Sequence, residues 1–256
     1  MTLTRSSLSF GALLVTIVTA MSAGCAAPQT HVREIDAQVD PILKQMCDLL
    51  DGAKAFRLRV RATMDRPVET GQLAQFHRTS DITAVRPNRL YAVTDSDDGK
   101  WTAWYRGKTL TVLDREANRY ATEAVPGRTD QMLDYMVEHY DLVVPMADLL
   151  AGKTYDSLLA NVQSGTYVGL HSVGDVKCHH LLFRQENIDW QIWIDAGRQP
   201  LPRKLVITYT QEPDQPQYVA VMDNWDLAPV VSEKTFTFSP PAGANSVPMS
   251  ELVAKE

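Results

Sequence analysis

The chain has 256 residues, of which 45% are hydrophobic and 22% are charged, and its formal net charge at pH 7 is −6. This composition supports a sizeable core and excludes a wholly disordered chain. The acidic balance argues against nucleic acid, and against an anionic lipid surface, as the main partner.

The N-terminus has the pattern of a secretory signal. Arg5 precedes an apolar run over residues 8–21, which is too short to span a bilayer comfortably. Small residues then lead directly to Cys25, an arrangement that resembles the lipobox of bacterial lipoproteins, in which the cysteine is acylated and becomes the first residue. We therefore expect residues 1–24 to be a signal peptide and Cys25 to be lipidated. Ordinary secretion, with cleavage among the small residues, is the alternative.

Acylation of Cys25 would anchor the protein to a membrane through a short tether, residues 25–33. By resemblance to the sorting rules of enteric bacteria, Ala26 after the cysteine implies the outer membrane. We expect a protein of the bacterial cell envelope that faces the periplasm.

A helix is predicted after the tether. Asp40 and Pro41 form a start signal, with the aspartate as N-cap and the proline at the first helical position. An apolar stripe follows, and the helix is expected to end at Asp51 and Gly52.

Residues 56–64 have the clearest strand pattern in the chain. Apolar side chains alternate with Arg57, Arg59 and Arg61, so the two sets point to opposite faces. We interpret the arginine row as a solvated outer face with acidic partners on neighbouring strands, rather than as an anion site.

Short strands at hairpin spacing continue this meander, and a helical insert interrupts it. Further strands are predicted over residues 71–85, 89–94, 100–106, 109–114 and 118–124. In the insert, Thr129 can cap a helix whose apolar stripe includes Met132 and Met136. Methionines give an adaptable apolar surface, which suits either a lid over an apolar ligand or a plain core.

Strands resume after the insert, at residues 165–173, 176–185, 188–209, 217–225 and 235–238. We expect residues 34–248 to form one domain, followed by an irregular tail over residues 249–256. Within the run 188–209, one face is purely apolar and the other still carries Trp193 and Val206, which predicts that both faces are covered.

Two cysteines remain if Cys25 is acylated. Cys47 and Cys178 could pair in an oxidising envelope, and closing so long a loop could stabilise the fold by about 4 kcal/mol in the chain-entropy model. Two buried free thiols are the alternative.

The motifs of common hydrolases, metalloproteases and nucleotide-binding proteins are missing from the sequence. His179 and His180 are adjacent, and neighbouring residues on a strand point to opposite faces, so the two do not readily share one metal. We therefore expect no catalytic residue, no metal site and no cofactor.

Several segments resemble a family of predicted periplasmic proteins, domain of unknown function 2092. They are VKCHHL at 176–181, FRQ at 183–185, DWQIWI at 189–194, PLPRKLVIT at 200–208, RPNRL at 86–90 and TFTFSPP at 235–241. The resemblance covers residues 35 to about 248, and its motifs are structural in character.

That family is similar in architecture to the LolA/LolB lipoprotein carriers and to the sensor protein RseB. The resemblance implies an α+β fold: a strongly curved antiparallel half-barrel sheet of about eleven strands, with an N-terminal helix and a central helical insert capping the concave face. It also implies a concave apolar cavity suited to acyl chains.

Our first hypothesis is an anchored, monomeric envelope protein that binds a lipid or an acylated protein in this cavity. The expected ligand-binding residues are Leu58, Val60, Met64, Trp104, Trp190, Ile192, Leu205 and Ile207 on the wall and Met132 and Met136 on the lid. The alternatives are a protein-interaction or sensor module without a stable small ligand, and a hydrolase.

Overall fold

The computed structural model describes residues 34–142 and 144–253. The predicted signal peptide, Cys25 and the tether lie outside these residues. All statements below concern the unit that begins after them.

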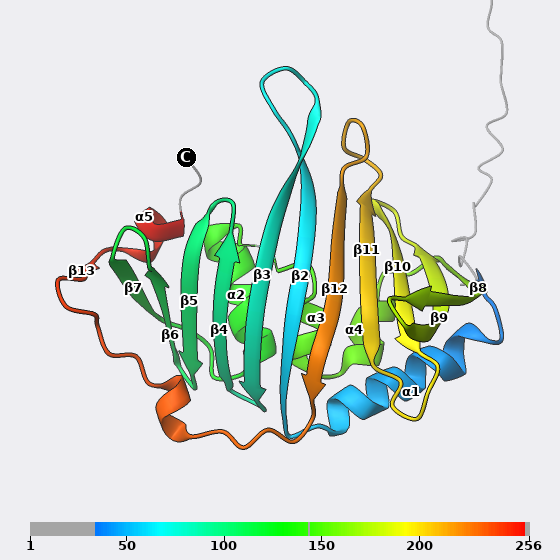
Figure 1. Ribbon diagram of the computed structural model, residues 1–256, viewed down its shortest axis with the longest axis horizontal. Coiled ribbons are helices and arrows are strands. Elements are labelled where there is room, and N and C mark those ends of the chain that lie inside the picture. Colours follow the sequence, from blue (N-terminus) through cyan, green and yellow to red (C-terminus); the bar gives the residue numbers. More distant parts are fainter. Residues whose placement is uncertain (1–33, 143, 254–256) are drawn as a thin grey trace, which may run out of the picture. The chain divides into compact units, whose positions relative to one another are not determined.

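The dominant element is a single 13-stranded sheet with the order β1-β8-β9-β10-β11-β12-β2-β3-β4-β5-β6-β7-β13 (Figure 1). The strands are β1 (Glu34–Ile35), β2 (Ala55–Pro67), β3 (Leu73–Val85), β4 (Arg89–Ser96), β5 (Gly99–Arg106), β6 (Thr109–Asp114), β7 (Arg119–Ala124), β8 (Ser164–Val173), β9 (Val176–Arg184), β10 (Ile188–Asp195), β11 (Pro202–Tyr209), β12 (Gln217–Asp226) and β13 (Asn245–Ser246). Neighbours are antiparallel except at the two edges, where the two-residue strands β1 and β13 pair in parallel with β8 and β7. The sheet is curved and does not close, so the predicted half-barrel is confirmed.

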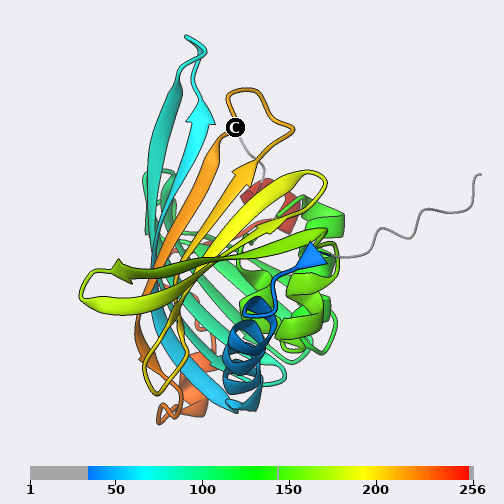
Figure 2. The same cartoon turned by 90° about the vertical axis from the view of Figure 1, so that its right-hand side faces the viewer.

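The α-helices lie along one side of this sheet, whereas the 3₁₀ helix η1 (Glu233–Phe236) lies apart from them, next to β4 and β5. The α-helices are α1 (Val39–Gly52), α2 (Thr129–Tyr140), α3 (Ala147–Ala151), α4 (Thr154–Leu159) and α5 (Met249–Val253). Figure 2 shows α1 and the insert α2–α4 together on the concave side, as the α+β prediction requires. None of the helices within residues 34–142 and 144–253 is long and apolar enough to cross a membrane.

The alternation of β2 places the core. Phe56, Leu58, Val60 and Ala62 are buried in the main hydrophobic cluster, beneath the helices. The same row continues across the sheet because Val60 pairs with Met222 on one side and with Ser80 on the other. One face of the curved sheet is therefore the floor of a single core.

The arginine row of β2 lies on the convex face, as predicted. Arg59 donates two hydrogen bonds of 2.8 Å to Asp81 on β3, and Arg61 pairs with Asp223 on β12. The interpretation as a solvated face with cross-strand acidic partners is confirmed.

Three local predictions need correction. The alternating segment 235–238 is not a strand: Ser232 caps η1 by accepting a hydrogen bond from the amide of Lys234. The tail is not wholly irregular, because α5 buries Met249 and Leu252 in the main core. Helix α1 begins at Val39, one residue before the predicted N-cap.

Both faces of the hairpin β10–β11 are covered, as expected. Ile192 and Ile194 lie in the main core on the side of α1. On the opposite face Trp193 and Val206 form a second, small cluster with Cys178. The cover on that side comes from the chain itself, since the tip of the β8–β9 hairpin packs against it.

The insert is fixed to the rest of the fold by polar contacts at both ends. At its start, the amide and hydroxyl of Thr129 both donate to the carbonyl of Pro87. At its end, Thr154 is fully buried, and its hydroxyl and amide donate to the carboxylate of Asp51 at 2.7 and 3.1 Å. Asp51, from the last turn of α1, thus acts as the cap of α4.

We predict that Asp51→Ala lowers the free energy of unfolding by about 2 kcal/mol, because it leaves a buried hydroxyl and a helix-end amide without an acceptor. Urea denaturation followed by circular dichroism measures this. The control is Asp48→Ala on the same helix, which removes only an exposed ion pair with Lys44 and should change stability by less than about 0.5 kcal/mol. Equal effects of the two variants would contradict the capping role.

Candidate ligand-binding site on the concave face

The predicted wall residues mostly come together on the concave face. Trp190 pairs with Ile207 and Ile192 pairs with Leu205 across β10 and β11. These four residues, with Leu58 and Val60 of β2, are buried in the main core, and Met64 packs against it with partial exposure. The sequence therefore identified an apolar face of the sheet correctly.

The prediction that Trp104 belongs to the ligand-binding wall is wrong. Its neighbour Tyr105 is fully buried in the main core, so Trp104 points to the other face of β5. There it packs against Tyr91 and Phe238, with ring centroids 5.7 and 5.0 Å away. The C-terminal segment covers Trp104 on the convex side, and Trp104 does not belong to the concave wall.

The concave face is occupied by the insert. Met132 and Met136 of α2 and Met146, which precedes α3, are all buried in the main core. The large hollow implied by the family resemblance is therefore filled with the protein's own side chains in this structure. Between the sheet and the α2–α3 connection lies a pocket of about 60 Å³.

This volume is too small for a whole acyl chain. A cavity of about 150 Å³ is needed to hold one benzene molecule. A long ligand therefore requires the α2–α3 connection to move away from the sheet.

The pocket has an apolar interior and polar groups on its wall. Its lining residues are Val60, Ala62, Arg78, Ser80 and Ile82 from β2 and β3, Tyr218 from β12, and Val144, Pro145, Met146 and Leu150 from the insert. Ser80 and Thr94 share a hydrogen bond of 2.9 Å between their hydroxyls. Burial raises the pKa of Tyr218 to about 12, so its hydroxyl keeps its proton at neutral pH and can donate.

Sequence reasoning found only Val60 of this pocket. The inner face of β3 carries a signal that was available, since Phe76, Arg78 and Ser80 alternate with His77 and Thr79, and only Phe76 and Ser80 of these five residues are partly buried. The contributions of β12 and of the α2–α3 connection had no such signal, because they depend on contacts between distant parts of the chain.

One buried donor on the concave wall has no partner. Trp190 is only 4% exposed, yet its indole Nε1 makes no hydrogen bond within the described residues. The ring stacks on Phe183 at a centroid distance of 4.0 Å. A buried donor without an acceptor is costly and rare in folded proteins, and it is a group that a ligand oxygen could satisfy.

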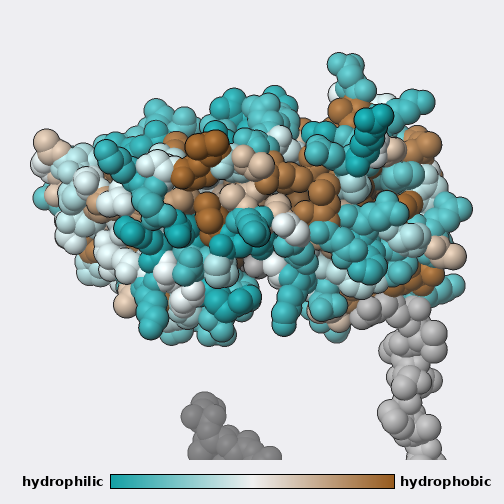
Figure 3. Space-filling view, turned by 90° about the horizontal axis from the view of Figure 1, so that it is seen from below, coloured by the Kyte–Doolittle hydropathy of each residue, from teal (hydrophilic) through white to brown (hydrophobic). Residues whose placement is uncertain are grey.

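Apolar residues also reach the surface at the lower end of the fold. Figure 3 shows a band of hydrophobic residues across the middle of this end, bordered by hydrophilic side chains. The core is therefore not fully enclosed by polar groups at the rim.

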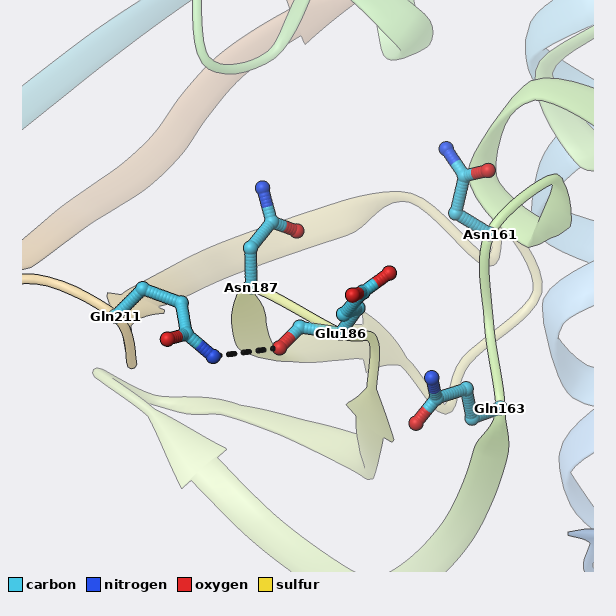
Figure 4. Close-up of a pocket in the computed structure, with 5 residues that line it drawn as sticks. All are labelled: Asn161, Gln163, Glu186, Asn187 and Gln211. Carbon is cyan, nitrogen blue, oxygen red and sulfur yellow. Dashed lines mark hydrogen bonds between the residues drawn. The ribbon is translucent and has the colours of Figure 1, made fainter. Parts of the chain in front are cut away.

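A second depression is polar throughout. It has a volume of about 460 Å³ and is lined by Asn161, Gln163, Glu186, Asn187 and Gln211 (Figure 4). Gln211 donates through Nε2 to the backbone carbonyl of Glu186 at 3.2 Å. It is the larger of the two hollows, but its side chains are exposed loop residues and none of the predicted site residues lines it.

The two histidines lie on opposite faces of β9, as predicted. The Nδ1 atom of His179 is 3.2 Å from the hydroxyl of Tyr167. On the other face, His180 stacks on Trp193, and its Nδ1 is 3.0 Å from Nδ1 of His171. Within the described ranges no three His, Cys, Asp or Glu side chains are grouped to hold a metal ion.

The possible disulfide between Cys47 and Cys178 does not form in this structure. Cys47 and Cys178 are both buried and free. Cys47 belongs to the main core under α1, whereas Cys178 belongs to the small cluster with Trp193 and Val206. Because β9 separates the two clusters, the thiols lie on different sides of the sheet and cannot pair.

A sequence model of one protein family, described as predicted periplasmic protein (DUF2092), matches residues 39–250. The chain belongs to this family. A search of curated proteins finds no match.

Solved structures show the fold more widely. The crystal structure of the lipoprotein LppX from Mycobacterium tuberculosis is 12% identical, with a TM-score of 0.50 over 77% of this chain and 98% of that chain. LprF from Mycobacterium bovis is 15% identical, with a TM-score of 0.48 over 82% and 99% of the two chains. A LolA superfamily protein from Nitrosomonas europaea is 9% identical, with a TM-score of 0.37 over 78% and 97%. The similarity to LppX supports the half-barrel fold and by itself assigns no ligand.

We predict that both described thiols resist alkylation in the native protein. Burial raises the pKa of Cys47 to about 12 and also raises that of Cys178, so neither is a thiolate at pH 8. Iodoacetamide labelling without reductant, read by peptide mass spectrometry, should modify both only after unfolding.

A peptide containing Cys47 linked to Cys178 would contradict the arrangement.

The thiol of Cys47 also makes the free energy of unfolding depend on pH, with a definite sign. Its folded pKa lies above the ordinary value of about 8.5, so the stability it contributes is complete below that pH and is lost as the pH rises toward 12.

Proposed function

We propose that this family member is an envelope protein that binds the acyl chain of a lipid or of an acylated protein on the concave face of its sheet. The observation that carries the proposal is the pocket between β2, β3, β12 and the insert, which has apolar depth and uncommitted polar groups on one wall. Apolar pockets with a few polar groups are the usual form of small-molecule sites.

We expect the middle of the insert to move away from the sheet while its two ends stay in place. Thr129 and Thr154 fix the two ends through hydrogen bonds to Pro87 and Asp51. Between them, the contact with the sheet is made by methionines, which adapt to new shapes at low cost. An acyl chain would enter between the α2–α3 connection and β2–β3, enlarging the pocket that is already present.

The unpaired indole of Trp190 supports a bound ligand over a plain core. Trp190 does not line the small pocket, so a ligand would reach its Nε1 only after the insert has moved, and an oxygen of that ligand would then supply the missing partner.

The test is the binding of a monoacylglycerol labelled with pyrene at the end of its chain. Ser80→Leu places a larger side chain in the pocket, and we expect it to raise the dissociation constant of the probe at least tenfold. Thr79→Leu is the matched control, because Thr79 is the next residue on the same strand and lies on the exposed convex face. It should bind as the unaltered protein does.

Ser80 is a better test position than Ile192. Ile192 is fully buried, so a charge there would act on folding as well as on binding. Failure of the unaltered protein to bind the probe would overturn the proposal. In that case, crosslinking in intact cells would show whether the same face holds a protein partner instead.

The proposal includes an anchor at Cys25. We predict that Cys25→Ser moves the protein from the membrane fraction to the soluble fraction of its own bacterium, because one acyl-bearing residue would be lost. Ala27→Ser, two residues later, is the control and should remain in the membrane fraction. A Cys25→Ser protein that stays with the membrane would contradict the anchor.

A further inference from the structure

Arg78 is a solvent-exposed cation on the inner side of β3, and it has no protein partner among the described residues. It lies on β3 opposite Ala62 of β2 and Ser96 of β4, and it lines the pocket. Among the arginines that the structure describes, only Arg78 and Arg198 have neither an ion pair nor a hydrogen bond. Arg198 lies in the turn between β10 and β11, in solvent.

The surroundings of Arg78 are otherwise apolar on the inner side. Val60, Ile82, Met146 and Leu150 form the depth of the pocket. On the convex face, Arg59 and Arg61 of β2 have carboxylate partners on neighbouring strands, Asp81 and Asp223. Arg78 therefore places a positive charge without a carboxylate partner at the edge of the apolar pocket.

A second donor lies on the same wall. Tyr218 lines the pocket and is 7% exposed, and its hydroxyl makes no hydrogen bond within the described part of the chain. Arg78 is close enough to Tyr218 to lower the pKa of its phenol, although the larger effect of burial raises that pKa. Two donors without acceptors thus face one pocket.

We propose that the ligand is an acyl chain that ends in a carboxylate, bound through its head by Arg78 and Tyr218 with its chain beneath the insert. This inference rests on the proposed function and adds the chemistry of the head group. A guanidinium binds a carboxylate through two parallel hydrogen bonds, and the tyrosine hydroxyl adds a third donor.

The charge of the pocket favours a carboxylate over a phosphate monoester. Arg78 is the only charged residue among those that line it. One cation matches the single negative charge of a carboxylate, whereas a phosphate monoester carries about −1.5 to −2 at pH 7. The remaining lining residues would leave the second charge without a partner.

The test compares palmitate, methyl palmitate and a monoacyl glycerol phosphate by displacement of the neutral pyrene probe. The unaltered protein should bind palmitate at least tenfold more tightly than its methyl ester. Arg78→Met should lose that preference and keep its affinity for the ester. Arg198→Met makes the same chemical change at the other unpaired arginine and should leave both affinities unchanged.

The outcomes separate the two proposals. If palmitate and its ester bind the unaltered protein equally, or if Arg78→Met keeps the preference, the head-group inference is overturned and acyl-chain binding stands. If the phosphate compound binds more tightly than palmitate in a way that requires Arg78, the carboxylate assignment is overturned. If no acyl compound binds, the proposed function fails first.

Discussion

Arg86 joins three elements that are distant in the sequence. Its guanidinium donates to the carbonyl of Leu150 at 2.9 Å and to that of Leu50 at 3.5 Å, and it lies 5.4 Å from the ring of Phe56. Leu150 and Leu50 belong to the last turns of α3 and α1, where carbonyls lack helical partners and a cation is favoured. One side chain therefore satisfies two helix ends while it covers the lower end of the sheet.

The geometry around Arg86 also explains a glycine. Gly152 follows α3 with a φ of +100°, and a Cβ there would lie 3.0 Å from Nη1 of Arg86. The backbone conformation favours glycine at this position, and a Cβ there would also require the end of the Arg86 side chain to shift by a few tenths of an ångström. The chain can then turn directly from α3 into α4, whose cap is Asp51. The two ends of the insert are held to the sheet and to α1 by hydrogen bonds, which depend strongly on geometry. Its middle is held by apolar contacts, which tolerate small shifts.

The main features of the fold could be predicted because they depend on local patterns. The alternation over residues 56–64 gave the inner and outer faces of β2, and turn residues separated the strands. Trp104 was placed on the wrong face because Trp104 and Tyr105 are both large and aromatic, and only the distant Phe238 shows which face each occupies. The segment 235–238 alternates like a strand, but the cap of Ser232 forms a 3₁₀ helix instead.

The candidate site was harder to predict than the fold, for the same reason. Its apolar wall follows from alternation, whereas its polar groups depend on which strands are neighbours. Arg78 and Tyr218 are 140 positions apart in the sequence, and they meet because β12 pairs with β2 and β2 pairs with β3. Nothing local in either strand indicates that pairing. The filling of the hollow by Met132, Met136 and Met146 likewise depends on where the insert folds back.

The cost of opening the insert sets a condition on the ligand. Exposing a buried methionine costs about 1.5–3 kcal/mol, so displacing three costs at most about 5–9 kcal/mol. Each methylene of an acyl chain that replaces them contributes about 0.8 kcal/mol, so about six to eleven methylenes offset the cost. Short acids cannot open the insert on this balance, whereas the chains of ordinary membrane lipids can. The packed concave face is then compatible with a binding role, because the same methionines that close it in the absence of ligand can repack against a long chain.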